Sequence, residues 1–334
     1  MYVFELAGQD DAFAAYEASH AASDVRVLAS GLARARGVTD RVRHLAFTHR
    51  ISDLIGRTEG DQLVECARAV LEAATFDREG AIAVRAVDVR GTAGVDTQRA
   101  ERELGQALVD RGFTVDLDDP DHELRALFSE NQDRNDSSDE PGICVLGWLT
   151  AETVRDFARR RPTDRPFFQP GSMDPMLARA LVNVAGARGT ATVLDPMCGT
   201  GGVLVEAGLV GADVVGLDAQ ATMVQGTRQN LADALDGEWH ILRGDAASLP
   251  VADGAVDAVV FDTPYGRQSK IEGQLDVLVR DALREARRVA PRCVVVGDRP
   301  WARPAGEAGW TIEASFERRV HRSLTRYVLV LRRE

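Results

Sequence analysis

The sequence predicts an α/β protein in which an α+β N-terminal half precedes a doubly wound, mostly parallel sheet. Short apolar runs alternate with helical segments from about residue 192 to residue 297, an alternation typical of parallel sheets. Two final β-type runs predict an antiparallel hairpin at the edge of this sheet. At 334 residues, of which 45% are hydrophobic, the chain suits two or three globular domains.

The expected elements of the C-terminal half follow one another in regular order. A short buried strand ends at Asp195, a glycine-rich loop follows it, and the next helix continues to about residue 210. Three later strands end at or just before Asp218, Asp245 and Asp262. Ligands of such sheets bind at the carboxyl ends of the strands, where we expect these four aspartates to meet. The expected strands are 192–194, 213–217, 239–243, 255–261, 293–297, 311–316 and 326–331, with further helices at 222–235 and 275–289.

The N-terminal half has a weaker pattern. The acidic tract at 129–140 is most simply a solvated loop, and residues 149–170 suggest a linker helix followed by an extended entry into the C-terminal half. The remaining segments suggest helices within 10–22, 60–75 and 98–112, β-type runs near 44–49, 81–89 and 114–117, and a hairpin of 123–128 with 143–148.

The net charge of −12 lies entirely in residues 1–150, which carry 28 acidic and 16 basic side chains. Lys270 is the only lysine, and this acidic, arginine-rich composition indicates a salt-adapted organism such as a haloarchaeon. At molar salt the Debye length is about 3 Å, so counterion release contributes little to phosphate binding. The acidity therefore weakens a nucleic-acid assignment without excluding it.

The sequence gives no sign of export or of a membrane or metal. No apolar run approaches the roughly 20 residues that span a bilayer, and the N-terminus lacks the features of a secretory signal. We therefore expect a cytoplasmic protein without a membrane partner. The four cysteines form no CxxC pair and the six histidines show no ligand spacing, so we expect no disulfide framework and no metal site.

The segment Asp195-Pro196-Met197-Cys198-Gly199-Thr200-Gly201-Gly202 predicts a nucleoside-binding loop, since glycines let the backbone turn tightly and approach a ligand. Asp218 ends the next strand, where a carboxylate binds ribose hydroxyls, and Asp245 is placed to accept from an adenine amine. Each aspartate alone could be a helix N-cap, but the three features in this order predict S-adenosylmethionine (SAM) as cofactor. Phe168 could cover the adenine or pack in the core. The expected cofactor-binding residues are Phe168, Ser172, Asp195, Met197, Cys198, Gly199, Gly201, Asp218, Ala219, Asp245, Ala246 and Asp262.

The segment Asp262-Thr263-Pro264-Tyr265 predicts the catalytic centre. A carboxylate and a backbone carbonyl that accept the two N–H bonds of a planar amine can aim its lone pair at a methyl group. Pro264 stiffens this clamp, and the ring of Tyr265 can stack on a base, worth roughly 1–3 kcal/mol. No strong base is required, because the nitrogen loses its proton after methylation, to Asp262 or to water. A β-turn is the simpler alternative, but the position after a strand at the ligand-binding edge favours catalysis.

These motifs resemble those of the archaeal tRNA guanosine-10 N2-methyltransferases over nearly the whole chain. Residues 195–201 resemble the family's first motif, 169–173 its cofactor-side motif, and 262–267 its Asp-Pro-Pro-Tyr-Gly signature, from which Thr263 departs. Because that position offers a backbone carbonyl, threonine should keep the contact and lose some rigidity. The resemblance implies a ferredoxin-like region at 1–50, a THUMP RNA-binding domain at 51–149 (residues 115–121 are similar to it), a linker at 150–170, and a Rossmann-like SAM-dependent methyltransferase domain at 171–334.

The resemblance also implies tRNA as partner, with N2-methylguanosine and then N2,N2-dimethylguanosine as products. It leaves open a small activating protein, as in eukaryotic relatives. Because the target amine is paired in folded tRNA, base extrusion is expected, at a cost of a few kcal/mol. The candidate RNA contacts, each of which could also be a solvated surface charge, are Arg159, Arg160, Arg161, Arg267, Arg318, Arg319 and Arg322.

Three alternatives share part of this pattern. An enzyme acting on guanosine 6 of tRNA or on ribosomal RNA would share most motifs, although the guanosine-6 relatives tend to begin the clamp with asparagine. A DNA amino-methyltransferase would share the clamp, but the N-terminal half fits RNA better. A catalytically silent RNA-binding protein is disfavoured by the four intact aspartates.

Overall fold

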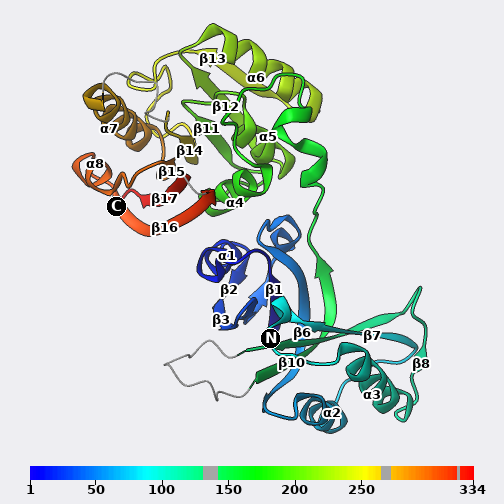
Figure 1. The fold of residues 1–334 in the computed structure, drawn as a ribbon. Coiled ribbons are helices and arrows are strands. Elements are labelled where there is room, and N and C mark those ends of the chain that lie inside the picture. Colours follow the sequence, from blue (N-terminus) through cyan, green and yellow to red (C-terminus); the bar gives the residue numbers. More distant parts are fainter. Residues whose placement is uncertain (131–141, 265–271, 322–323) are drawn as a thin grey trace. The chain divides into compact units, whose positions relative to one another are not determined.

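The computed structural model describes residues 1–130, 142–264, 272–321 and 324–334, which form two compact units, Met1–Val154 and Arg155–Glu334 (Figure 1). We call them unit 1 and unit 2 and describe each by itself. The boundary expected between residues 50 and 51 falls inside strand β6 (Thr48–Gly60), and residues 155–170 of the expected linker belong to unit 2. Most of the acidic tract at 129–140 lies outside the described residues.

Unit 2 is built on a seven-stranded sheet in the order β13-β12-β11-β14-β15-β17-β16. Its first five strands are parallel, while β17 is antiparallel to both β15 and β16. This confirms the predicted doubly wound sheet with an edge hairpin. The strands are β11 (Thr192–Asp195), β12 (Asp213–Asp218), β13 (Trp239–Arg243), β14 (Ala258–Asp262), β15 (Arg292–Gly297), β16 (Thr311–His321) and β17 (Leu324–Arg332).

Helices cover both faces of this sheet, with α4, α5 and α6 on one face and α7 and α8 on the other (Figure 1). The first of them shows how the local sequence sets its ends. The side chain of Asp174 caps α4 by accepting from the Met176 N–H, Pro175 takes the first helical position, and Gly186 ends the helix at φ +91°. The helices are α4 (Pro175–Ala185), α5 (Gly202–Leu209), α6 (Ala221–Ala234), α7 (Glu272–Val289) and α8 (Ala302–Glu307).

Unit 1 contains an eight-stranded sheet in the order β3-β4-β1-β6-β10-β9-β7-β8 and a small separate sheet of β2 and β5. The predicted pairing of β9 with β10 is confirmed. Strands β1 to β5 were not expected, because such short runs become strands only by pairing with one another and with β6. The strands are β1 (Tyr2–Leu6), β2 (Ala22–Ser23), β3 (Arg26–Ala29), β4 (Leu32–Ala35), β5 (Gly37–Val38), β6, β7 (Ala81–Asp88), β8 (Thr114–Val115), β9 (His122–Ser129) and β10 (Gly142–Glu152).

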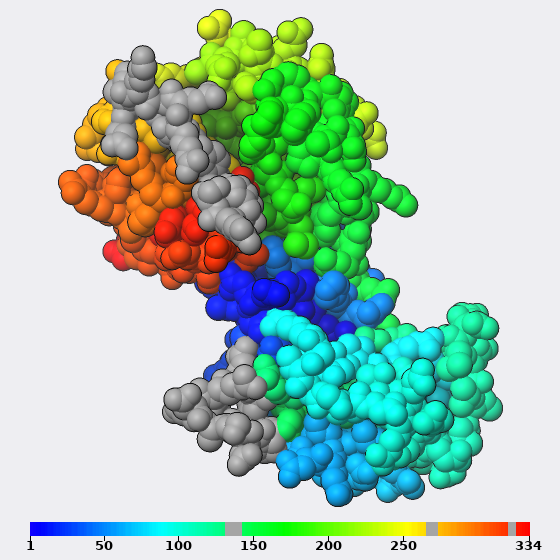
Figure 2. Space-filling view, in the orientation of Figure 1, coloured from blue at the N-terminus to red at the C-terminus, as the bar shows by residue number. Residues whose placement is uncertain are grey.

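The helices of unit 1 are α1 (Asp11–Ala18), α2 (Leu63–Ala73) and α3 (Thr97–Val109). Helices α2 and α3 bury leucines against β9 and β10, which gives this unit a core of its own. Figure 2 shows the N-terminal residues of unit 1 (blue) beside the segment near residue 90 (cyan). An ion pair between Asp11 and Arg90 joins these two segments. At the start of unit 2, two short 3₁₀ helices, η3 (Phe157–Arg160) and η4 (Pro162–Asp164), replace the expected linker helix.

Candidate active site

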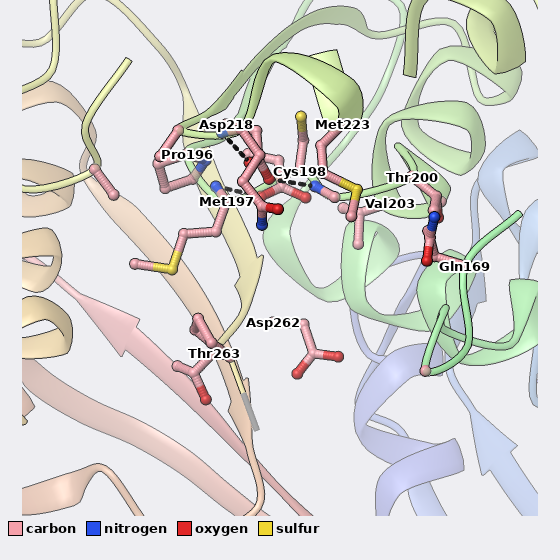
Figure 3. Close-up of a pocket in the computed structure, with 18 of the residues that line it drawn as sticks. Gln169, Pro196, Met197, Cys198, Thr200, Val203, Asp218, Met223, Asp262 and Thr263 are labelled. Atoms are coloured by element: carbon pink, nitrogen blue, oxygen red, sulfur yellow. Dashed lines mark hydrogen bonds between the residues drawn. The ribbon is translucent and has the colours of Figure 1, made fainter. Parts of the chain in front are cut away.

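A cavity of about 340 Å³ opens at the carboxyl ends of β11, β12 and β14 in unit 2 (Figure 3). Small-molecule sites commonly measure roughly 300–1,000 Å³. The glycine-rich loop, residues 169–173, the turns after β12 and β13, and residues 262–264 form its walls. Figure 3 shows Met197 and Asp218 on one side of the cavity and Asp262 and Thr263 on the other.

The glycine-rich loop is held in shape by hydrogen bonds on both of its sides. Asp195 Oδ1 accepts from the Met197 N–H at 3.0 Å, and the Thr227 hydroxyl of α6 donates to the Gly199 carbonyl at 2.6 Å. Gly199 and Gly201 have φ of +52° and +77°, which favour glycine. A Cβ atom on Gly201 would lie 2.7 Å from Thr227 Cγ2. The sequence analysis missed Thr227, because it supports the loop from a helix that carries no motif.

The expected ribose and adenine carboxylates stand at the cavity wall. Asp218 accepts from the N–H groups of Gly199 and Gln220, at 3.0 and 2.9 Å. Asp245 accepts from the Ala247 N–H at 2.9 Å. A carboxylate has about four acceptor sites, so both groups retain acceptor capacity while the backbone fixes their orientation. Both aspartates line the cavity.

The cavity is acidic. Asp195, Asp218, Asp245 and Asp262 line it, and no arginine, lysine or histidine is among its described lining residues. Burial raises the pKa of Asp195 well above its ordinary value, the neighbouring carboxylates of Asp218 and Asp262 raise it further, and the Met197 N–H bond opposes them. Such a cavity suits a ligand that carries positive charge and several N–H and O–H donors.

Thr263, the departure from the family signature, is anchored by its backbone and its side chain. Its N–H donates to the Val296 carbonyl at 2.8 Å, and the Trp301 Nε1–H donates to its hydroxyl at 3.3 Å. Gly297 makes this contact possible, because a Cβ atom there would lie 2.3 Å from Trp301 Nε1. Trp301 and Gly297 were missed from the sequence, since only the pairing of β14 with β15 brings them to the clamp. Pro264 is exposed, and Tyr265 lies outside the described residues.

Asp262 ends β14 and faces a buried arginine. Arg326 Nη2 of β17 lies 3.6 Å from Asp262 Oδ2. The strand register brings them together, because Asp262 lies beside Val296 of β15, which pairs with Val328 of β17. Sequence reasoning missed Arg326, since it lies in an arginine-rich segment and only the antiparallel return of β17 distinguishes it.

The other predicted cofactor contacts divide into two groups. Ser172, Met197, Cys198, Ala219 and Ala246 line the cavity with Gly199. Gly201 is not a lining residue and acts through the shape of the loop. Phe168 is also outside the lining and is 42% exposed. Its neighbour Phe167 packs on α6 instead, where a Cβ atom on Gly226 would lie 2.0 Å from the Phe167 ring.

The structure argues against Arg160 as an RNA contact. Its guanidinium binds Glu206 at 2.9 Å and Asp156 at 2.7 Å, and Glu206, which is fully buried, also binds Arg179 at 2.8 Å. Arg160 therefore attaches the start of unit 2 to α4 and α5. Among the other candidates Arg159, Arg161 and Arg319 are exposed and Arg318 is half-buried, while Arg267 and Arg322 lie outside the described residues.

Within the described ranges, no cluster of three or more histidine, cysteine, aspartate or glutamate side chains is arranged for a metal ion. Among the described helices, none combines the length and the apolarity that a membrane-spanning segment requires.

Comparisons with known proteins agree with this geometry. The family described as "RMKL-like, methyltransferase domain" matches residues 162–327, which include the whole cavity. A tRNA (guanine(10)-N2)-dimethyltransferase of Methanothermobacter thermautotrophicus is 34% identical over 298 residues, covering 87% of this chain and 84% of the relative. Another of Pyrococcus abyssi is 28% identical, covering 76% and 74%.

Two further comparisons concern Thermus thermophilus. A tRNA (guanine(6)-N2)-methyltransferase from this organism is 30% identical, covering 75% of this chain and 71% of the relative. The crystal structure of its TrmN protein superposes with a TM-score of 0.53 at 21% identity, covering 100% of this chain and 99% of the other, and shows the same fold.

Proposed function

Because the chain belongs to the tRNA (guanine(10)-N2)-dimethyltransferase family, we propose that it catalyses SAM-dependent methylation of the N2 amine of guanosine 10 in tRNA. One observation carries the proposal: Asp262 and Thr263 face the glycine-rich loop across a single cavity (Figure 3). An acceptor pair for an amine thus stands opposite a loop suited to a nucleoside cofactor.

The residues of the cavity fit SAM. Asp218 and Asp245 offer acceptors for ribose hydroxyls and an adenine amine, and the acidic lining suits a cofactor with a sulfonium and an ammonium group. Bound SAM supplies a methyl group on positively charged sulfur. Gly199 and Thr200 present backbone groups to the cavity just before α5 begins. Because Gly199 has no side chain, a ligand can approach its backbone closely.

The clamp acts by orientation. The Asp262 carboxylate and the Thr263 carbonyl accept the two N–H bonds of the guanine amine, which directs the nitrogen lone pair away from the ring plane. The anchoring of Thr263 by Val296 and Trp301 keeps its carbonyl in place. Holding two reacting groups in a productive geometry accounts for a large part of many enzymatic rate enhancements.

We assign tRNA recognition to unit 1, which we propose to comprise the ferredoxin-like and THUMP regions. The alignment with the Methanothermobacter relative covers 298 residues, more than the residues of unit 2, and therefore extends into unit 1. Of the candidate arginines, Arg159, Arg161 and Arg319 of unit 2 are exposed and available for phosphate contacts. We place the activity in the cytoplasm.

Nucleoside mass spectrometry tests this proposal. Purified protein, labelled SAM and unmodified tRNA at high salt should give label in N2-methylguanosine and N2,N2-dimethylguanosine, mapped to position 10. A tRNA with adenosine at position 10 is the matched control and should stay unlabelled. Activity of the chain alone would show that no activating protein is required. Asp262→Asn should lose methyl transfer while retaining SAM binding, and wild-type turnover by this variant would contradict the clamp.

Guanosine 6 of tRNA is the second candidate position, because the Thermus tRNA (guanine(6)-N2)-methyltransferase covers three quarters of this chain at 30% identity. Both candidate reactions methylate the N2 amine of a guanosine, so the shape of the cavity does not separate them. The higher identity of the guanosine-10 relative favours position 10. Label at position 6 in the mapped tRNA would reverse the assignment.

A further inference from the structure

Arg326 is a buried cation beside Asp262, one of the aspartates that line the cavity. Its side chain is 6% exposed and that of Asp262 is 20% exposed, with 3.6 Å between Nη2 and Oδ2. Guanidinium stays protonated in proteins. A buried charge is stabilised by a partner of opposite charge, and the carboxylate of Asp262 at the end of β14 is such a partner for Arg326.

We propose that Arg326 is a positioning residue that keeps Asp262 ionised during methyl transfer, so that Asp262 accepts a hydrogen bond and does not keep the released proton. This inference rests on the proposed function, because it concerns the same amine. The nitrogen lone pair forms the new N–C bond while the C–S bond breaks and its electron pair remains on sulfur. The proton then lost by nitrogen passes to water.

The charges around Asp262 show why such a residue is required. Asp195 of β11 acts electrostatically on Asp262, and like charges disfavour ionisation of both. Asp218 and Asp245 add negative charge to the same cavity. β15 offers only Val296 at this register. Arg326 of β17 supplies positive charge in contact with Asp262.

An ionised Asp262 has a consequence for catalysis. Both oxygens of a carboxylate accept, whereas a carboxylic acid presents a donor on one oxygen and a neutral acceptor on the other. If Asp262 gained a proton, its hydrogen bond with the amine would no longer be charge-assisted, and the orientation of the amine would be held less firmly. The sequence left open whether Asp262 only accepts a hydrogen bond or also takes the final proton. Arg326 favours the first role of Asp262, because it stabilises the ionised carboxylate.

The test compares Arg326→Met, which removes the charge, with Arg326→Lys, which keeps it. In Arg326→Met the acidic limb of the pH profile of kcat/KM should move to higher pH by about one to three pH units. Arg326→Lys should restore most of the wild-type profile. Arg332→Met, on an exposed position of the same strand, is the matched control and should leave the profile unchanged.

A second measurement is independent of activity. Infrared difference spectra of each cofactor-free protein, with Asp262→Asn as the reference that identifies the band, should show Asp262 ionised in the wild type at pH 6 and protonated to a larger extent in Arg326→Met. SAM affinity, measured by calorimetry, should change less than threefold.

The outcomes separate the two proposals. A rate loss that is equal at every pH, or an Asp262 band that does not respond to Arg326→Met, would overturn the role of Arg326. If Arg326→Met fails to fold, Arg326→Gln, which also removes the charge but keeps a polar side chain, takes its place. An Asp262 ionisation curve displaced to higher pH in Arg326→Gln supports the proposal, and a loss of activity without displacement refutes it. Lack of tRNA methylation by the wild type would refute the proposed function and leave the infrared result standing.

Discussion

Replacing Asp195 by asparagine should stabilise the cofactor-free protein at neutral pH while weakening SAM binding. Asp195 is 2% exposed, and burial raises its pKa above the ordinary value of 3.8. Between 3.8 and the folded pKa, the folded protein holds a proton that the unfolded chain has released. Stability therefore falls as the pH rises through this window, and above it the penalty of the buried carboxylate is complete.

The magnitude follows from the contacts of Asp195. Asparagine removes the charge but keeps an oxygen to accept from the Met197 N–H, which lies 3.0 Å from Oδ1. Removing the buried charge should raise the free energy of unfolding by about 1–3 kcal/mol, the range for an incompletely satisfied buried polar group. In a unit of this size each kcal/mol moves the Tm by about 2–4 °C, so the Tm should rise by about 2–12 °C. Loss of a charged acceptor, worth about 1.5–3 kcal/mol, should raise the Kd for SAM by about 10- to 150-fold.

Thermal unfolding between pH 4 and pH 8 and calorimetry with SAM at pH 7 measure both effects. The stabilisation should be largest at neutral pH and should shrink as the pH falls toward 4, because the folded wild-type protein then holds the proton and the unfolded chain begins to take it up. Asp213→Asn, at an exposed position that begins β12, is the control and should leave the Tm unchanged. A variant that is no more stable at pH 7, or equally more stable at every pH, would refute the reasoning.

Three further predictions follow from contacts around the site. Thr263→Val and Trp301→Phe should each cost about 0.5–1.5 kcal/mol of unfolding free energy, and because they share one hydrogen bond, a double-mutant cycle by urea unfolding should show the pair to be less than additive. Gly201→Ala should lower the free energy of unfolding by about 1–3 kcal/mol, because Gly201 has a positive φ, and it should also lower SAM affinity. Gly237→Ala is the control, because a Cβ atom there meets open space, and it should change neither stability nor SAM affinity. Glu206→Gln removes the carboxylate that binds the buried Arg179 and leaves Arg160 with Asp156 alone. It should destabilise the protein by about 3–5 kcal/mol of unfolding free energy, and an unchanged Tm would contradict the anchoring role of Glu206.

The sequence was most informative where structure is local. Apolar runs that end at Asp195, Asp218 and Asp262 predicted the strands and the edge at which a ligand binds, because strand period and glycine-loop geometry depend on neighbouring residues. The sequence was least informative where function depends on pairing across the sheet. Arg326 and Trp301 reach the clamp only through the order β14-β15-β17, which residue spacing does not encode.

Unit 1 illustrates the same limit from another side. The boundary expected near residue 50 separated two regions that β6 joins, since one continuous strand pairs with β1 on one side and with β10 on the other.

Arg160 shows the same limit of sequence-based prediction for a charged side chain. An arginine in the run 159–161 resembles a surface contact until the position of Glu206 is known, because burial of a long side chain depends on the helices packed against it.

The structure changes the meaning of Thr263 in the clamp. A proline at this position would fix φ, but it could neither donate to the Val296 carbonyl nor accept from Trp301. Thr263 lacks the rigid ring of a proline, but two hydrogen bonds and burial, with 1% of its surface exposed, hold it in place instead. Gly297 belongs to this arrangement, because any side chain there would displace the indole. Thr263, Gly297 and Trp301 therefore act together: the N–H and hydroxyl of Thr263 hold its carbonyl at the position we propose for the amine.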